Sequence, residues 1–412
     1  MLYVPIIRLL MLLIKIVIFR QITFTQINNT TKIIFSMQKK IAFIATVYKN
    51  LADFSMPHMK LLQSLGFEIH VYACEPRRKQ DLVDMGVICH DLQMKRKPFH
   101  WHNISAIRKL SASLKEERFE MIHCHTPMGG VVGRVSGRLA QIPRIIYTAH
   151  GFHFFKGSSR MSWLIYYTVE KMLAKWTDYL ILVNEEDYII SKTFDVRKAV
   201  TWIPEHTSIE RFSIDINTDD YRKKLDLSSS DFVFICVAEL ITRKNHIQII
   251  ESLSRIVKDG NYPSIKCLFV GEGELLHSLQ QKVNDMKLKN VINFLGFRKD
   301  IPELLKISDV GILVSYQEGL PVFGLESIAS GLPFITTDIR GSQDLVLDYE
   351  NGIKVKPNDI EATVKAMIYI IDNPTVLREM GLKSKNMALQ YDELINIKKT
   401  KKIYTEALSI KL

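Results

Sequence analysis

Short apolar runs alternate with helical stretches along most of the chain, and this alternation limits the possible fold more than any other feature. Strands that alternate with helices form a parallel sheet whose two faces are both covered. The alternation is interrupted once, near residues 200–212, where an apolar run meets Pro204. We therefore predict an α/β fold with two Rossmann-like domains that face a central cleft. The expected strands are 41–46, 67–73, 87–92, 121–125, 145–150 and 179–184, followed by 232–237, 266–271, 291–297, 310–315, 334–337 and 352–355.

The length of 412 residues is too great for a single hydrophobic core and agrees with two domains. We expect domain boundaries at 37–205 and 206–390, with residues 391–412 forming a C-terminal helix that returns to the first domain. Residues 1–36 form an N-terminal extension that is rich in apolar and basic residues and has no acidic residue. A charge at the centre of a bilayer costs about 2.5–3.5 kcal/mol, so Arg8 and Lys15 disfavour a spanning helix. The extension is either an interfacial amphipathic helix or a segment upstream of a natural start at Met37.

The formal net charge of +11 indicates an anionic partner. A nucleotide diphosphate, a lipid diphosphate and an anionic membrane surface all fit, whereas nucleic acid does not, because no zinc spacing or basic–aromatic motif is present. The chain also has no Asp-x-Asp sequence, which argues against a metal site of that kind. Its five cysteines form no Cys-x-x-Cys pair and indicate buried apolar residues in a reducing cytoplasm.

The segment 315–341 carries the densest chemistry in the chain. We predict a strand at 310–315, a loop at 317–324 that contains glycine and proline, a helix at 325–330 and a strand at 334–337. In open α/β sheets, ligands bind at loops of this kind, at the carboxyl ends of strands. Glu318 in the loop and Glu326 in the first turn of the helix can therefore converge on one small molecule, and the free N–H groups of 322–324 can face an anion. Alternatively, Glu326 only complements the helix dipole.

Several motifs together resemble the retaining GT-B glycosyltransferases of family 4. The segment just described resembles the Glu-x7-Glu signature of that family, and His123–Gly130, Tyr147–Phe154 and Asp338–Gly341 resemble stretches of its bacterial capsule, exopolysaccharide and O-antigen enzymes. The resemblance covers residue 38 to the end of the chain. It implies that the first domain binds an acceptor, the second domain binds a nucleotide-sugar donor, and no cofactor or metal is used. At the level of the family, it favours a UDP-sugar.

The resemblance also implies roles for individual residues. The family's diphosphate-binding lysine matches Lys244, but Glu239 stands where an arginine is usual, so we infer that Arg243 supplies the second cation. We expect His123 to point to the face of its strand opposite to that of His125, so that one of the two faces a ligand. Either His125 or His150 can instead be a satisfied polar group of the core. The expected catalytic residues are Glu318, His125 and His150, and the expected donor-binding residues are Lys244, Arg243, Glu326, Gly271, Phe297, Gly319, Leu320 and Val322.

The acceptor side is expected to meet a membrane. The loop Met94–Pro98 contains three basic residues, and a lipid-linked or oligosaccharide acceptor at an anionic surface would give them a partner. The loop 47–57 after the first strand is also expected to face the acceptor, and Asp53 in it is a weak candidate for a base. We therefore expect a cytoplasmic protein that is peripheral on the inner face of the cell membrane.

Three other functions use part of the same pattern. A sugar-nucleotide epimerase of the same architecture binds the same donor and changes the sugar without an acceptor. A glycosidase also uses two carboxylates, but it needs no diphosphate site. A non-catalytic subunit of a two-chain transferase needs neither Glu318 nor Glu326.

Overall fold

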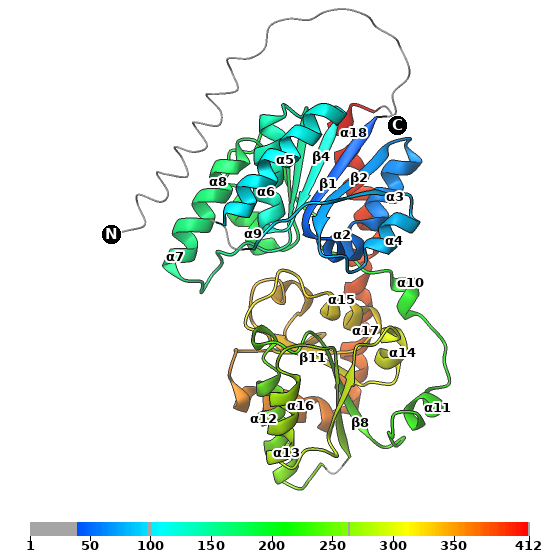
Figure 1. Ribbon diagram of the computed structural model, residues 1–412. Helices are drawn as coiled ribbons and strands as arrows, with labels where there is room; N and C mark the ends of the chain where they lie inside the picture. Colours follow the sequence, from blue (N-terminus) through cyan, green and yellow to red (C-terminus); the bar gives the residue numbers. More distant parts are fainter. Residues whose placement is uncertain (1–38, 97–99, 263, 411–412) are drawn as a thin grey trace, which may run out of the picture.

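Two parallel sheets, each covered by helices, make up two domains that lie one above the other (Figure 1). The computed structural model describes residues 39–96, 100–262 and 264–410. The strand order is β3-β2-β1-β4-β5-β6-β7 in the first sheet and β10-β9-β8-β11-β12-β13 in the second. The predicted fold of two Rossmann-like domains is confirmed.

Most strands coincide with the apolar runs of the sequence, and they are buried because helices cover both faces of each sheet. The first sheet contains β1 (Lys40–Val47), β2 (Glu68–Cys74), β3 (Ile88–Asp91), β4 (Met121–His125), β5 (Arg144–Ala149), β6 (Tyr179–Leu182) and β7 (Ala199–Trp202). The second contains β8 (Phe232–Val237), β9 (Ile265–Val270), β10 (Ile292–Gly296), β11 (Val310–Leu313), β12 (Phe334–Thr337) and β13 (Gly352–Val355).

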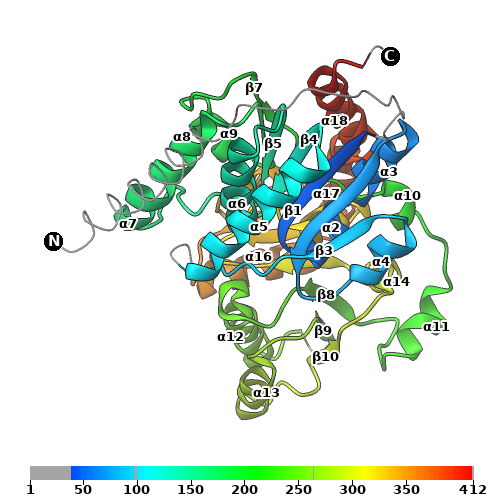
Figure 2. The same ribbon diagram turned by 45° about the horizontal axis from the view of Figure 1, so that its top comes forward.

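The helices surround the two sheets (Figure 2). The first domain has α2 (Tyr48–Phe54), α3 (Met56–Ser64), α4 (Lys79–Asp84), α5 (Trp101–Glu117), α6 (Pro127–Leu139), α7 (Arg160–Ser162), a π-helical turn at Trp163–Tyr167, α8 (Thr168–Ala174) and α9 (Glu185–Ser191). The rest of the chain adds α10 (Ile209–Phe212), α11 (Thr218–Lys223), α12 (His246–Lys258), α13 (Leu276–Asp285), α14 (Ile301–Lys306), α15 (Val322–Ala329), α16 (Ile360–Asp372), α17 (Pro374–Ala388) and α18 (Glu393–Leu408). None of the helices in the described ranges is long and apolar enough to cross a membrane.

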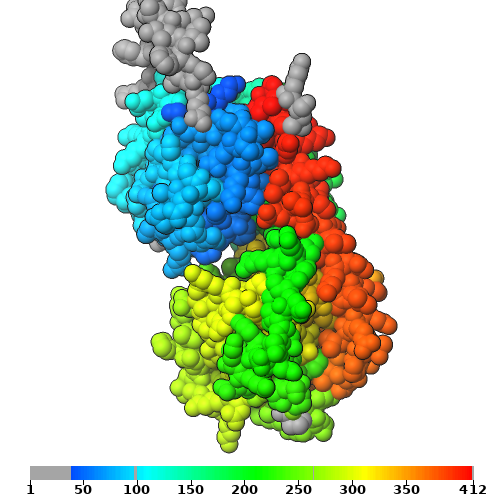
Figure 3. All heavy atoms as spheres, turned by 90° about the vertical axis from the view of Figure 1, so that its right-hand side faces the viewer, coloured from blue at the N-terminus to red at the C-terminus, as the bar shows by residue number. Residues whose placement is uncertain are grey.

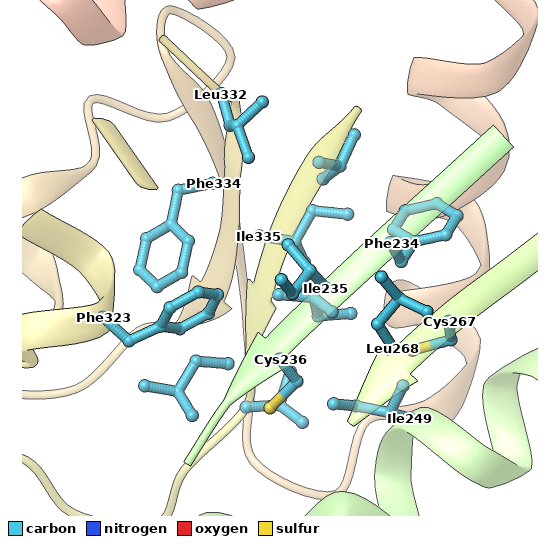
Figure 4. Close-up of a cluster of buried hydrophobic side chains, with 14 of the residues drawn as sticks. Phe234, Ile235, Cys236, Ile249, Cys267, Leu268, Phe323, Leu332, Phe334 and Ile335 are labelled. Atoms are coloured by element: carbon cyan, nitrogen blue, oxygen red, sulfur yellow. The ribbon is translucent and has the colours of Figure 1, made fainter. Parts of the chain in front are cut away.

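The core of the second domain is packed on both sides of its sheet. Phe234, Ile235 and Cys236 are consecutive in β8 and are all fully buried, so both faces of this strand contact apolar side chains. Figure 4 shows Ile235 and Cys236 between Ile249 of α12 and Phe323 of α15. This packing makes β8 and the neighbouring β11 a rigid base for the loops that follow them.

The last helix, α18, returns to the first domain, as the sequence predicted. Figure 3 shows the C-terminal segment (red) alongside the first domain (blue). Tyr404 is buried there, and its hydroxyl bonds Nδ1 of His123 at 2.9 Å. Two segments therefore connect the domains, and they bond each other, since Thr207 donates its N–H to the carbonyl of Tyr391 and accepts from the N–H of Glu393.

Each sheet has one point where the strand order reverses, between β1 and β4 in the first and between β8 and β11 in the second. Ligands bind at such points in open α/β sheets. The loops after β5 and β11 contact each other across the domains. They are so close that a Cβ added to Gly319 would lie 1.8 Å from the carbonyl oxygen of His150. The surface between the two domains is hollowed (Figure 3).

Candidate active site

Glu318 is the centre of a charged cluster at the reversal point of the second sheet. It follows β11, and it is buried with only 6% of its surface exposed. Lys244, in the short 3-10 turn Thr242–Lys244 after β8, donates to Oε1 of Glu318 at 2.7 Å. Arg243 donates to Oε2 at 3.3 Å and to the carbonyl of Gln317 at 2.9 Å. The two cations predicted to bind the diphosphate therefore form ion pairs with the carboxylate that was predicted to be catalytic.

The start of α15 lies next to this cluster. Its first residues are Val322, Phe323 and Gly324, whose N–H groups have no acceptor inside the helix, since the first backbone bond of α15 runs from Leu325 N–H to the carbonyl of Pro321. These groups and the helix dipole favour an anion. Leu320, just before them, is buried. The apolar side chain of Leu320 therefore fixes the loop, and the free N–H groups that follow it remain available to a ligand.

Glu326 lies in the second turn of α15, because the helix begins at Val322 rather than at the predicted residue 325. The prediction of a first-turn position was wrong because Pro321, which fits the position before a helix, was assigned to the loop. The Glu326 side chain is half-buried, and within the described residues it makes no hydrogen bond or ion pair. Burial raises the pKa of this carboxyl to about 7, and the charge of Arg211 partly opposes that rise. Both carboxylate oxygens are thus available as acceptors.

Two further predicted donor-binding residues follow β9, which lies beside β8, and β10, the edge strand beyond β9. Gly271 has φ +140°, and a Cβ there would lie 2.1 Å from the carbonyl oxygen of Ala238, so glycine is required for the loops after β8 and β9 to touch. Phe297 follows β10, and 65% of its surface is exposed. An exposed ring at this end of the sheet is available to pack against a flat ligand. Glu239, at the position where the resemblance implies an arginine, is also exposed.

His125 and His150 lie in the first domain, across the domain contact from Glu318, and they bond each other. Nδ1 of His125 lies 3.0 Å from Nε2 of His150, and Nδ1 of His150 bonds the carboxylate of Glu205. Nε2 of His125 is buried and has no hydrogen-bond partner in the part of the chain that the structure describes. Burial, followed by the neighbouring histidines His123 and His150, lowers the pKa of His125 well below its usual range, so its ring is neutral.

His123 corrects one prediction. Its ring centroid lies 4.2 Å from that of His125, so the two side chains share a face of β4. The prediction of opposite faces was wrong because side chains alternate along a strand, which places residues two apart on the same side. Both nitrogens of His123 are bonded, to Tyr404 and Thr148. His123 therefore fits the role of a satisfied core residue, whereas His125 does not.

The other predicted features of the first domain are the segment after β1, the basic loop and the extension, and the Phe54 ring of the first of these lies 5.3 Å from the ring of His150. The segment after β1 is the helix α2 rather than a loop, and Asp53 in it pairs with Lys49 and Arg78, which occupy the carboxylate. In the basic loop, Lys95 and Arg96 are exposed. Residues 97–99 and the extension 1–36 lie outside the described residues.

Three residues near the site were missed in the sequence. Glu205 follows Pro204 between the domains and bonds His150. Arg340 and Asp187 form a buried ion pair at 3.0 Å. Arg340 stands inside the motif Asp338–Gly341, which contributed to the family resemblance but indicated no role for Arg340. The contacts that bring these three residues to the site join positions that are distant in the sequence, so no local pattern marks them.

Comparison with known proteins places these residues in a family. The description "Glycosyl transferases group 1" matches residues 217–387, and "Glycosyl transferase 4-like" matches residues 40–184. The chain is 34% identical over 375 residues to the putative glycosyltransferase EpsD of Bacillus subtilis, covering 90% of this chain and 97% of that protein. It is 30% identical to the UDP-Gal:alpha-D-GlcNAc-diphosphoundecaprenol alpha-1,3-galactosyltransferase of Escherichia coli, covering 85% of this chain and 92% of that protein.

Solved structures agree on the fold. HepE of Anabaena in complex with UDP superposes with a TM-score of 0.74 at 16% identity, covering 90% of this chain and 100% of that one. WaaG, a glycosyltransferase involved in lipopolysaccharide biosynthesis, superposes with a TM-score of 0.69 at 16% identity, covering 89% and 99%.

Proposed function

This chain belongs to the family 4 glycosyltransferases of the GT-B type, and on that premise we propose that it is a retaining, metal-independent α-glycosyltransferase of surface polysaccharide synthesis. In this proposal, a nucleotide diphosphate sugar, most simply a UDP-sugar carrying a hexose or N-acetylhexosamine, is the donor. A polyprenyl-diphosphate-linked glycan is the acceptor. The observation that carries the proposal is the cluster of Lys244, Arg243 and Glu318 beside the start of α15, across the domains from His150.

The cluster supports the loss of a diphosphate leaving group. When the bond between sugar and diphosphate breaks, negative charge grows on the departing phosphate, and preorganised cations and N–H groups stabilise it. Lys244, Arg243 and the first N–H groups of α15 supply such groups. The departing diphosphate can itself accept the proton of the incoming hydroxyl on the same face of the sugar. The protein is then left to orient the two substrates.

The remaining donor contacts follow from the same geometry. Glu326 has two free carboxylate oxygens that suit the hydroxyls of a ribose, and the exposed ring of Phe297 suits the face of a base. Gly271 and Gly319 let the loops around the proposed donor site pack closely against each other. His125 and His150 then lie on the acceptor side of the sugar.

The names of relatives support the donor and the acceptor. The E. coli relative is named for UDP-Gal, for a diphosphoundecaprenol-linked acceptor and for an alpha-1,3 product. A Campylobacter jejuni relative, 21% identical, is named for a diphospho-undecaprenol-linked acceptor. An acceptor of this kind supports peripheral association with an anionic cytoplasmic membrane face.

The epimerase alternative is less well supported. An epimerase needs an acid and a base on opposite sides of a carbon that loses its proton, but Glu318 is paired with two cations and His125 is neutral and buried. A glycosidase, likewise, has no use for the cations that surround Glu318.

A donor panel tests the proposal. The purified chain is incubated with individual UDP-, GDP- and TDP-sugars, with and without polyprenyl-diphosphate-linked glycans, and released nucleotide and glycan mass are measured. We expect acceptor-dependent release of nucleotide, a gain of one sugar, and an α linkage in the product by NMR. Glu318→Gln is the matched control. A changed sugar without acceptor would instead identify an epimerase, and a product whose anomeric configuration is opposite to that of the donor would refute retention.

A further inference from the structure

Arg340 lies between the two domains, and no step of the proposed chemistry uses it. It follows β12 in the second domain, and only 4% of its surface is exposed. A buried guanidinium is costly unless its N–H groups are bonded. Its contacts therefore show what it is built to hold.

The contacts divide between the domains. On the second domain, Nε and Nη2 donate to the carbonyl oxygen of Glu318, at 3.2 and 3.1 Å. On the first domain, Nη1 donates to the carbonyl oxygen of Phe152 at 2.7 Å and to Oδ1 of Asp187 at 3.0 Å. A single planar guanidinium thus holds the backbone of Glu318 and the loop that begins at His150.

The first-domain side of this contact is itself fixed. Asp187, in the first turn of α9, is fully buried and accepts through Oδ2 from the N–H of Phe152 and from Asn184, both at 2.9 Å. Asp187 therefore holds the N–H of Phe152 while Arg340 holds its carbonyl. The loop that positions His150 has little freedom as long as the ion pair is intact.

Close backbone packing brings the loops within reach of Arg340. A Cβ on Gly319 would lie 1.8 Å from the carbonyl oxygen of His150, and one on Gly341 would lie 1.9 Å from the carbonyl oxygen of Gly319. A Cβ on Gly151 would be 3.0 Å from Cα of Gly319. Three glycines thus permit a backbone-to-backbone contact that the guanidinium bonds on both sides.

We propose that Arg340 is a positioning residue of the transfer reaction, which holds Glu318 against His150 when the two domains are closed. This inference rests on the proposed function, since Glu318 and His150 face a donor only under that function. Arg340 touches no substrate. It acts through the two loops, and its bonds to Phe152 and Asp187 exist only while the domains are together. Closure and assembly of the site are therefore one event.

Kinetics separate this role from a purely structural one. Donor contacts from Lys244, Glu326 and α15 all lie in the second domain, so we expect Arg340→Gln to leave KM for the nucleotide sugar nearly unchanged. We expect kcat to fall about 10²-fold, the cost of misplacing reacting groups by about 1 Å. The kcat of Arg340→Lys should be higher than that of Arg340→Gln. Asp187→Asn weakens only the first-domain side of the contact, so its kcat should lie between those of the two Arg340 variants.

The matched control is Arg134→Lys. Arg134 is an equally buried arginine that pairs with Glu170 at 2.7 Å and bonds the carbonyl of Gly130, all within the first domain. We expect this variant to lower the melting temperature without lowering kcat per folded molecule.

A distance measurement tests closure directly. Spin labels on cysteines introduced at two exposed positions, Ala112→Cys in α5 and Ser278→Cys in α13, report on the two domains. The background is Cys89→Ala, because Cys89 is the native cysteine that is not buried. With UDP-sugar present, we expect one short distance for the otherwise unsubstituted chain and for Arg134→Lys. We expect an additional longer distance for Arg340→Gln and Asp187→Asn.

The outcomes are separable. If the unsubstituted chain transfers sugar and Arg340→Gln keeps its kcat and its short distance, the positioning role is refuted and the proposed function stands. If no donor–acceptor pair supports transfer by the unsubstituted chain, the proposed function itself is refuted. If Arg340→Gln does not fold, Arg340→Lys and Asp187→Asn carry the same test, and unchanged kcat in both refutes the role.

Discussion

Lys244 and Glu318 are 74 residues apart in the sequence, yet the Lys244 ammonium lies 2.7 Å from a carboxylate oxygen of Glu318. They meet because β8 and β11 are neighbours at the point where the strand order of the second sheet reverses. Under the proposed function, a diphosphate bound at the start of α15 would share these cations with Glu318. Lys244 and Arg243 could therefore shift from Glu318 towards the diphosphate as its negative charge grows.

Lys244→Ala is expected to lower the rate more than the affinity for donor. Negative charge on the diphosphate grows as the glycosyl bond breaks, so a cation there acts mainly in the transition state. We expect kcat to fall about 10²-fold, the effect of removing one preorganised donor, with a smaller change in KM. The exposed Arg243 serves for comparison, and Arg243→Ala should have a weaker effect. Unchanged turnover in Lys244→Ala would remove this residue from the diphosphate site.

Glu326→Ala should show the opposite pattern. A carboxylate that bonds ribose hydroxyls acts equally in the ground state and the transition state, so its loss raises KM and leaves kcat at saturation unchanged. A charge-assisted bond contributes about 1.5–3 kcal/mol. Calorimetric titration with UDP-sugar should therefore show donor affinity lower by about 10-fold to 150-fold. Wild-type affinity in the variant would contradict the ribose role.

Donor affinity should also rise with pH through Glu326. Its pKa is raised to about 7 by burial, so the carboxyl is mostly protonated at pH 6 and mostly ionised at pH 8. If only the ionised form accepts both ribose hydroxyls, affinity rises about tenfold over that range. A UDP-sugar is the right probe, since its diphosphate is a diester without a titration near neutral pH. Glu326→Gln should flatten the profile, and a slope that survives in it would assign the titration to another group.

The same raised pKa predicts the sign of a stability effect. The folded protein favours protonated Glu326, so its contribution to the free energy of unfolding is fully present below the pKa of the unfolded chain. That contribution is lost as pH rises through about 7. Urea unfolding of the chain and of Glu326→Gln should give curves that diverge between pH 5 and pH 8, with Glu326→Gln more stable at the higher pH. Parallel curves would show that this carboxyl is solvated.

The fold was predictable because strand burial is local in the sequence. Residues 232–237 and 310–315 are apolar runs whose length and alternation with helices allow little but a parallel sheet, and β8 and β11 overlap them. The roles proposed for Lys244 and Glu318 came from motifs, but the contact between the two side chains could not be predicted from them. Which loops meet depends on the strand order, which no single segment encodes.

Arg340 shows more sharply what the sequence lacked. Its partners Phe152 and Asp187 lie 188 and 153 residues away and belong to the other domain. A motif can mark such a residue, but a bond to a backbone carbonyl leaves no pattern at the partner position. His123 and the start of α15 are different, since both were predicted wrongly although the sequence held enough to place them, through the alternation of side chains along a strand and through Pro321, which cannot continue a helix but can precede one.

The basic loop at Lys95 and Arg96 is expected to bind anionic membrane. Both residues are exposed, and Asn103 bonds the backbone of Lys95 at 2.9 and 3.1 Å, so the side chains can be changed while the loop keeps its anchor. Each basic residue near an anionic surface contributes about 1 kcal/mol. Lys95→Gln with Arg96→Gln should therefore weaken sedimentation with phosphatidylglycerol vesicles about 30-fold at low salt.

The control and the salt dependence decide the origin of that binding. Lys223→Gln with Lys224→Gln removes two exposed charges from the second domain and should leave vesicle binding unchanged. A chain truncated to begin at Met37 should keep activity on a water-soluble acceptor analogue, and its vesicle binding should fall further with added salt, because screening shortens the reach of the surface charge. Binding that resists salt would instead indicate apolar insertion, for which Trp101, 67% exposed at the start of α5, is a side chain to test. If neither the full-length chain nor the chain that begins at Met37 binds vesicles at any salt concentration, the lipid-linked acceptor is contradicted and a soluble acceptor is favoured.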